Sequence, residues 1–143
     1  MEIRQLTKDD IVRIELGEMF RPMFELYLDM YGKYAWMIED GDSPVAAFGC
    51  NFIYGEFGGV AEAWIKIFNK VKAKSIVKTA RLKIAETVDH CEIHRLQAVS
   101  RADEPYAVRF NEFMGFVKEG VLKRYFPDRV DGIMMRYEGK KCT

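Results

Sequence analysis

Three consecutive segments between residues 60 and 88 decide the fold of this chain. They read Val-Ala-Glu-Ala-Trp-Ile-Lys-Ile-Phe (60–68), Asn-Lys-Val-Lys-Ala-Lys-Ser (69–75) and Ile-Val-Lys-Thr-Ala-Arg-Leu-Lys-Ile-Ala-Glu-Thr-Val (76–88). The first is apolar and predicts a strand, whereas the last repeats apolar residues at helical spacing and predicts an amphipathic helix. We expect this helix to pack on a sheet through one stripe, formed by Val77, Ala80, Ile84 and Val88.

The turn between the predicted strand and helix carries Lys70, Lys72 and Lys74. The start of a helix has unpaired N–H groups and the positive end of the helix dipole, so it attracts anions. Cations gathered there are unfavourable unless a negative ligand joins them, which predicts a phosphate-bearing ligand. The alternative is that the lysines form a solvated face whose repulsion is screened by salt.

Composition indicates one domain, spanning residues 1–143, with ordinary globular character. Hydrophobic residues make up 49% of the chain and charged residues 31%, which is enough to bury a core without disulfides or metal. Because 22 basic residues balance 22 acidic ones, the charge indicates neither nucleic acid nor membrane as a partner.

Cysteine usage and the lack of long apolar runs indicate a protein of the cytoplasm. Cys50, Cys91 and Cys142 are an odd set without paired spacing, and we expect free thiols in a reducing compartment. No apolar run reaches the ~18 residues that a membrane-spanning helix needs. The spacing His90-Cys91-x-x-His94 supplies too few ligands for a structural zinc site, so no metal is expected.

Hydrophobic periodicity and turn residues give the order of elements β-α-α-β-β-β-α-β-α-β-β. Thr7 followed by Asp10 forms a capping pattern that starts the first helix, and Pro105 lies in the first turn of the last one. Strands are predicted over 2–6, 34–38, 45–52, 60–68, 96–100, 117–126 and 132–138, and helices over 7–16, 22–31, 76–88 and 105–114.

Residues 107–116 read Ala-Val-Arg-Phe-Asn-Glu-Phe-Met-Gly-Phe and are followed by Val117-x-Glu119-Gly120. Together with the order of elements, this segment resembles the GNAT superfamily of N-acyltransferases, over nearly the whole chain. The resemblance implies an α/β fold with a mixed, mostly antiparallel sheet. In that fold the fourth and fifth strands run parallel and splay apart.

The GNAT resemblance also implies acetyl-coenzyme A as a ligand. In the family, backbone N–H groups of an Arg/Gln-x-x-Gly-x-Gly/Ala turn hold its pyrophosphate. This chain departs from that pattern: lysine replaces the first basic residue, Ser75 the first glycine and Val77 the second small residue. A β-branched valine is bulky where glycine lets the backbone approach a phosphate. The matching positions are Lys72, Ala73, Lys74, Ser75, Ile76 and Val77.

The same resemblance assigns candidate catalytic roles. Glu62 stands near the family's general base on the fourth strand, although it could instead be a surface carboxylate paired with a lysine. A backbone N–H near Ile65 or Ile67 would polarise the thioester carbonyl. Asn111 stands where many members carry a tyrosine that protonates the departing thiolate, and an amide has no such proton. Tyr106 lies one turn earlier, and we expect it to face away from that position.

Two functions stay open at this point. One is an N-acetyltransferase that transfers an acetyl group from acetyl-coenzyme A to the amine of a small molecule or peptide. The other is a catalytically inactive GNAT-fold module that binds a protein partner or forms a homo-oligomer. The chain also resembles short GNAT-like proteins encoded among the virion genes of tailed phages, which implies a virion-associated module. That resemblance rests on the tryptophan of the fourth strand, the Lys-Ala-Lys turn (72–74) and the Arg-Phe-x-x-x-x-Gly segment (109–115).

Overall fold

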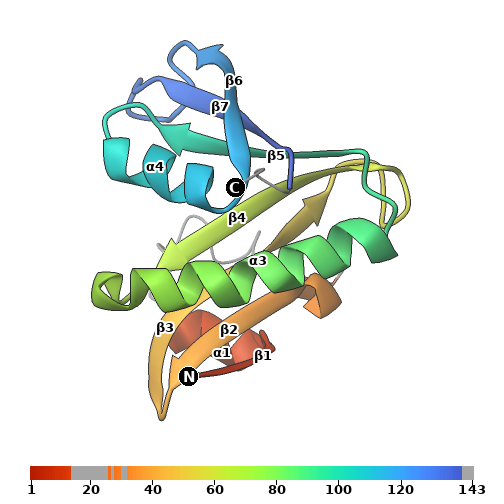
Figure 1. Cartoon of the computed structure of the whole chain (residues 1–143), viewed down its shortest axis with the longest axis vertical. Helices are drawn as coiled ribbons and strands as arrows, with labels where there is room; N and C mark the ends of the chain where they lie inside the picture. The colour runs from red at the N-terminus through yellow and green to blue at the C-terminus, as the bar shows by residue number, and fades with distance from the viewer. Residues whose placement is uncertain (14–25, 27, 30–31, 140–143) are drawn as a thin grey trace.

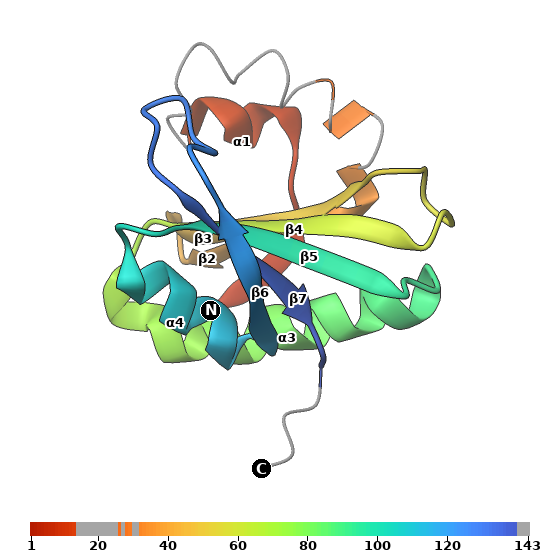
Figure 2. The same cartoon turned by 90° about the horizontal axis from the view of Figure 1, so that it is seen from above.

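The computed structural model describes residues 1–13, 26, 28–29 and 32–139. Within these residues seven strands form one sheet, with helices against both of its faces (Figures 1 and 2). The elements are β1 (Glu2–Gln5), α1 (Lys8–Arg13), η1 (Gly32–Tyr34), β2 (Ala35–Asp40), β3 (Ser43–Phe52), β4 (Val60–Ile67), η2 (Lys70–Lys72), α3 (Ala73–His90), β5 (Arg95–Arg101), α4 (Pro105–Phe113), β6 (Phe116–Leu122) and β7 (Gly132–Tyr137).

The strands lie in the order β1-β2-β3-β4-β5-β7-β6. Neighbouring strands are antiparallel except for β4 and β5, which are parallel. These two pair only over residues 60–62 of β4 and 95–97 of β5, and they then separate (Figure 1). The predicted mixed sheet with a parallel, splayed fourth and fifth strand is therefore confirmed.

α3 and α4 cover one face of the sheet (Figure 2). The buried stripe of α3 differs from the predicted one at both ends, because Val77 and Val88 are only half-buried and lie at its margin. Thr87 can lie in the buried stripe because its hydroxyl donates to the Lys83 carbonyl (2.8 Å). No helix of the described chain, α3 included, has the length and apolar character of a membrane span. The buried residues of α3 are Ile76, Ala80, Ile84 and Thr87.

α1 lies on the opposite face, and the loop between β6 and β7 projects on that same side (Figure 2). A second apolar cluster fills this face, and Trp64 of β4 packs against it. The helix predicted over 22–31 lies mainly outside the described residues. The buried members of the cluster are Leu6, Leu28, Ala35, Met37 and Ala47.

The strand predicted over 117–126 is wrong at its end, because β6 stops at Leu122. Arg124 adopts a left-handed φ of 54°, and its N–H donates to the Asp131 carboxylate (2.9 Å). A side chain thus takes the backbone donor that a longer ladder would need. Tyr125 and Phe126 are consequently loop residues, free to reach back over the sheet.

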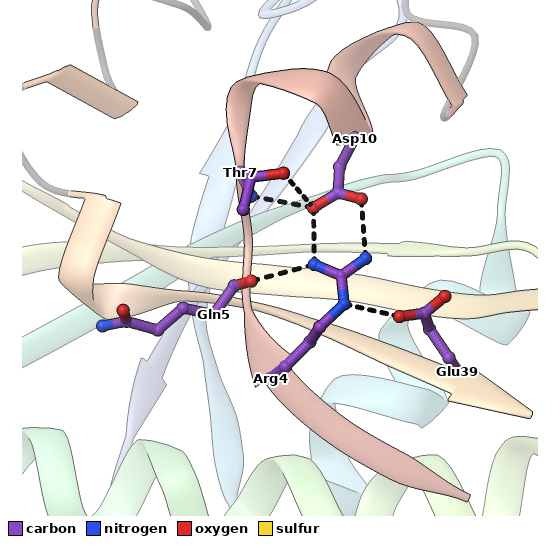
Figure 3. Close-up of polar contacts among 5 residues, drawn as sticks. All are labelled: Arg4, Gln5, Thr7, Asp10 and Glu39. Atoms are coloured by element: carbon purple, nitrogen blue, oxygen red, sulfur yellow. Dashed lines mark hydrogen bonds and ion pairs between the residues drawn. The ribbon is translucent and has the colours of Figure 1, made fainter.

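The predicted cap of α1 is part of a charged clamp (Figure 3). The Thr7 N–H donates to the Asp10 carboxylate (2.8 Å), as expected of a capping box. Arg4 of β1 donates to both oxygens of the same carboxylate (2.8 and 2.7 Å) and to Glu39 of β2. Asp10 is only 2% exposed. Burial favours its neutral form, but the Arg4 and Thr7 hydrogen bonds outweigh this and lower the pKa of Asp10 to about 2.

Replacing Asp10 by asparagine should lower the free energy of unfolding at pH 7 by about 2 kcal/mol. The contribution of the carboxylate is fully present above its unfolded pKa of 3.8 and is lost as the pH falls through about 2. Urea unfolding of wild type and D10N across pH 2–7 should therefore show a difference that shrinks below about pH 4. The exposed neighbour Asp9 provides the control, because D9N should lie close to wild type throughout.

Candidate functional site

The separation of β4 and β5 leaves a cleft of about 860 Å³ between the two strands. β3, α4 and the loop between β6 and β7 contribute further walls. Four of the predicted site residues line it: Glu62, Ile65, Ile67 and Asn111. The fold thus brings residues of the fourth strand and the last helix to one place.

Backbone N–H groups of β4 point into the cleft. Successive residues of a strand direct their N–H and C=O groups to opposite sides. The Phe68 N–H, directly after β4, donates to the Val45 carbonyl of β3 (2.8 Å), so even-numbered residues face β3. Ile65 and Ile67 therefore face β5, and both lie beyond the last β4–β5 pair. Their N–H groups can donate to a carbonyl oxygen held between the strands.

On the side of α3 and α4, the cleft is apolar apart from a fixed amide. The Asn111 Nδ2 donates to the Ser100 Oγ (2.7 Å), and the Ser100 hydroxyl contacts the Met135 sulfur (3.8 Å). Ser100 is buried, with 4% exposed. Asn111 can offer hydrogen bonds at this point but cannot act as an acid.

On the side of α1, the cleft holds a half-buried carboxylate among aromatic rings. Glu62 lies two residues before Trp64 on β4, so the two side chains share a face, and Trp64 packs against the apolar cluster on the side of α1. Burial raises the pKa of Glu62 above its ordinary value of 4.5. The pKa of Tyr125, in the loop after β6, is raised by burial and then by the charge of Glu62. A carboxylate with raised proton affinity is suited to accept a proton near neutral pH.

Lys70, one of the three lysines predicted to attract a phosphate, also lines the cleft, and so does Tyr106, for which no role was predicted. Tyr106 lies in the first turn of α4 and, 42% exposed, contributes to the rim of the cleft. The Lys70 Nζ lies 4.9 Å from the centre of that ring. Sites in α/β sheets gather beyond the carboxyl ends of parallel strands, and Tyr106 follows the end of β5. That rule was the signal that would have identified it.

No family model and no curated protein matches the chain, so the comparison rests on solved structures. A mutant of the spermidine N-acetyltransferase from Vibrio cholerae superposes with a TM-score of 0.73 at 16% identity, covering 96% of this chain and 94% of that one. Ard1 from Thermoplasma volcanium gives 0.72 at 17% identity, covering 94% and 95%. A chain of the NatC complex bound to Gag peptide and CoA gives 0.75 at 14% identity, covering 96% and 98%.

The chain has the GNAT fold. In this GNAT fold the predicted pyrophosphate turn, residues 72–77, begins at the end of η2 and forms the start of α3. It lies outside the lining of the cleft between β4 and β5. η2 already uses two of its donors, because the Lys72 N–H donates to the Asn69 carbonyl (3.2 Å) and the Ala73 N–H to the Lys70 carbonyl. Fewer backbone donors are left for an anion than the sequence indicated.

The side chains of this turn differ in what they face. Lys72 forms an ion pair with Asp40 (2.9 Å), whereas Lys74 and Ser75 are exposed. Ile76 is fully buried, and Val77 packs against the core. Any contact of the last two residues with a ligand would therefore be made by their backbone.

Replacing Ser75 by glycine should raise the affinity for coenzyme A, because the exposed side chain stands where a phosphate would approach the backbone. Replacing Val77 should not raise it, because that side chain already points into the core. Each glycine should cost stability, roughly 1 kcal/mol within a helix and less at its frayed end, with V77G losing core packing as well. Calorimetric titration of S75G, V77G and wild type with coenzyme A measures the difference. Equal affinities in all three proteins would argue against a phosphate at this turn.

Proposed function

We propose that this protein is an N-acetyltransferase that transfers an acetyl group from acetyl-coenzyme A to a primary amine. The observation that carries the proposal is a cleft through the sheet with unpaired β4 N–H groups between a half-buried carboxylate and an apolar wall. One similar structure is a spermidine N-acetyltransferase, and another belongs to the NatC complex bound to a peptide and CoA. Their sequence identities to this chain are too low to indicate which amine it would use.

The donor would enter on the side of α3 and α4. The pantetheine arm is long and mostly uncharged, which suits the apolar side chains of Ala98, Phe110 and Met114 that line this side. The N–H groups of Ile65 and Ile67 would hold the thioester oxygen and stabilise the negative charge that develops on it. The residues present therefore fit an acyl thioester in the cleft.

The amine would enter on the side of α1. Glu62 would accept a proton from the ammonium form, directly or through one water, and free the nitrogen lone pair. The nitrogen would then bond to the acetyl carbon as the carbon–sulfur bond breaks, the sulfur would leave with the electron pair, and the nitrogen would release its second proton to solvent. Burial of Glu62 disfavours its charged form and raises the carboxyl pKa above 4.5, which strengthens it as a proton acceptor.

The leaving sulfur would meet Asn111 rather than an acid. An ordinary thiol has a pKa of about 8.5, so a thiolate is a tolerable leaving group that can take its proton from solvent. The Asn111 amide, held by Ser100, can only donate a hydrogen bond. We expect a slower leaving step than a tyrosine would give.

A second candidate is a non-catalytic binding module, including the virion-associated role that the resemblance to phage proteins implies. Two observations favour it. Asn111 supplies no proton, and Lys72 of the predicted phosphate turn is engaged by Asp40. A protein partner or a second copy of the chain would then take the place of the amine.

The test is an acetylation assay with acetyl-coenzyme A and a panel of small-molecule and peptide amines, comparing wild type with Glu62→Gln. E62Q should slow turnover at least ~100-fold. The wild-type rate should fall as the pH falls through the pKa of Glu62, above 4.5, and this acid limb should disappear in E62Q.

E62Q should be at least as stable as wild type, because burial penalises the charge that the substitution removes. Glu119→Gln is the control, since Glu119 lies on β6 in an exposed pair with Arg95 (2.6 Å) and should leave the rate unchanged. Coenzyme binding without turnover of any amine would favour the non-catalytic module. Turnover that persists in E62Q would remove Glu62 as the base.

A further inference from the structure

Lys70 and Tyr106 bridge the open end of the cleft. Lys70 belongs to η2, which continues the arm made by β4, and Tyr106 belongs to the first turn of α4, which continues the arm made by β5. Both line the cleft, and the Lys70 ammonium lies over the Tyr106 ring at 4.9 Å from its centre. This is the geometry of a cation–π contact, which holds an otherwise flexible lysine in one place.

Most other cations near this end are engaged or turned elsewhere. Lys66 also lines the cleft, but it lies two residues after Trp64 on β4 and so shares the α1 side with Glu62. Lys72 pairs with Asp40 (2.9 Å), and Lys74 is exposed outside the cleft lining. Arg101 lines the cleft but is bound by Asp128 (2.7 Å) and Asp103 (3.1 Å). In the described chain no carboxylate forms an ion pair with Lys70, so its charge is available to an anionic ligand.

The one carboxylate lining this rim does not cancel that charge. Glu104 precedes Tyr106 and also lines the cleft, but it lies 3.6 Å from Arg101 and is neutralised there. The backbone donors of the neighbouring turn are partly used by η2, as the Lys72 and Ala73 N–H groups show. A phosphate at this end would therefore depend on a side-chain cation.

We propose that Lys70, oriented by the ring of Tyr106, is the residue that binds a phosphate group of the acyl-coenzyme A donor at the mouth of the cleft. The inference rests on the proposed function and adds to it a lysine and a tyrosine that lie outside residues 72–77, the turn matched to the family's pyrophosphate site. Tyr106 acts as a positioning residue: its ring fixes the ammonium, and its hydroxyl is not required.

The test is a calorimetric titration with two probes, coenzyme A and pantetheine, which share the thiol arm but differ in carrying phosphates. K70Q should weaken coenzyme A binding about tenfold, the value of one charge-assisted contact, and leave pantetheine binding unchanged. K78Q is the matched control: it removes an exposed lysine from the next turn of α3 and should change neither affinity.

The role of Tyr106 is tested by a double-mutant cycle. Y106F keeps the ring and should bind coenzyme A as wild type does, whereas Y106L should weaken it about threefold. In the K70Q background the Y106L effect should vanish, which a purely structural tyrosine would not show. Circular dichroism of each variant checks that it is folded.

The outcomes separate the two proposals. If K70Q binds coenzyme A with the same affinity as wild type, the role of Lys70 is overturned and the acetyltransferase proposal stays intact. If K70Q loses as much affinity for pantetheine as for coenzyme A, the role of Lys70 is also overturned, because the contact would not be with phosphate. Failure of wild type to bind coenzyme A at all would overturn both.

Discussion

The separation of β4 from β5 is the constraint on which the rest of the molecule depends. Each strand has an antiparallel partner on its other side, β3 for β4 and β7 for β5, and those ladders continue where the parallel pairing has stopped. The two arms are therefore held apart by their own sheets. The N–H groups that a longer β4–β5 ladder would have used, those of Ile65 and Ile67, are left to face the cleft.

The two faces of the sheet give the cleft two chemically different ends. Alternation along β4 places Ile65 and Ile67 with the apolar core under α3 and α4, and Glu62 and Trp64 on the side of α1. A thioester arm and an ammonium group need different surroundings, one apolar and one with a proton acceptor. One strand supplies both, because its successive side chains point to opposite faces of the sheet.

Several cations in and around the cleft are engaged by partners, and this narrows what can contact a ligand. Arg101 and Lys72 are held by aspartates, and Arg4 is held by Asp10 and Glu39 far from the cleft. Lys70 differs, since its neighbour is an aromatic ring rather than an acid. A ring positions a cation without neutralising it, and this is why we propose Lys70 as the contact for phosphate.

Periodicity, caps and turn residues act locally, so the sequence by itself determined the order of the described elements and placed Glu62, Ile65 and Ile67 on a strand and Asn111 on a helix. The parallel pair was predicted from the resemblance to the GNAT superfamily. The sequence missed the end of β6, where the Asp131 side chain takes a backbone donor, and the cleft positions of Lys70 and Tyr106. Only the tertiary structure decided these, because they depend on which residues distant in the chain meet. The number of free N–H donors in the phosphate turn likewise depended on η2, a short 3-10 segment whose hydrogen bonds leave no clear pattern in the sequence.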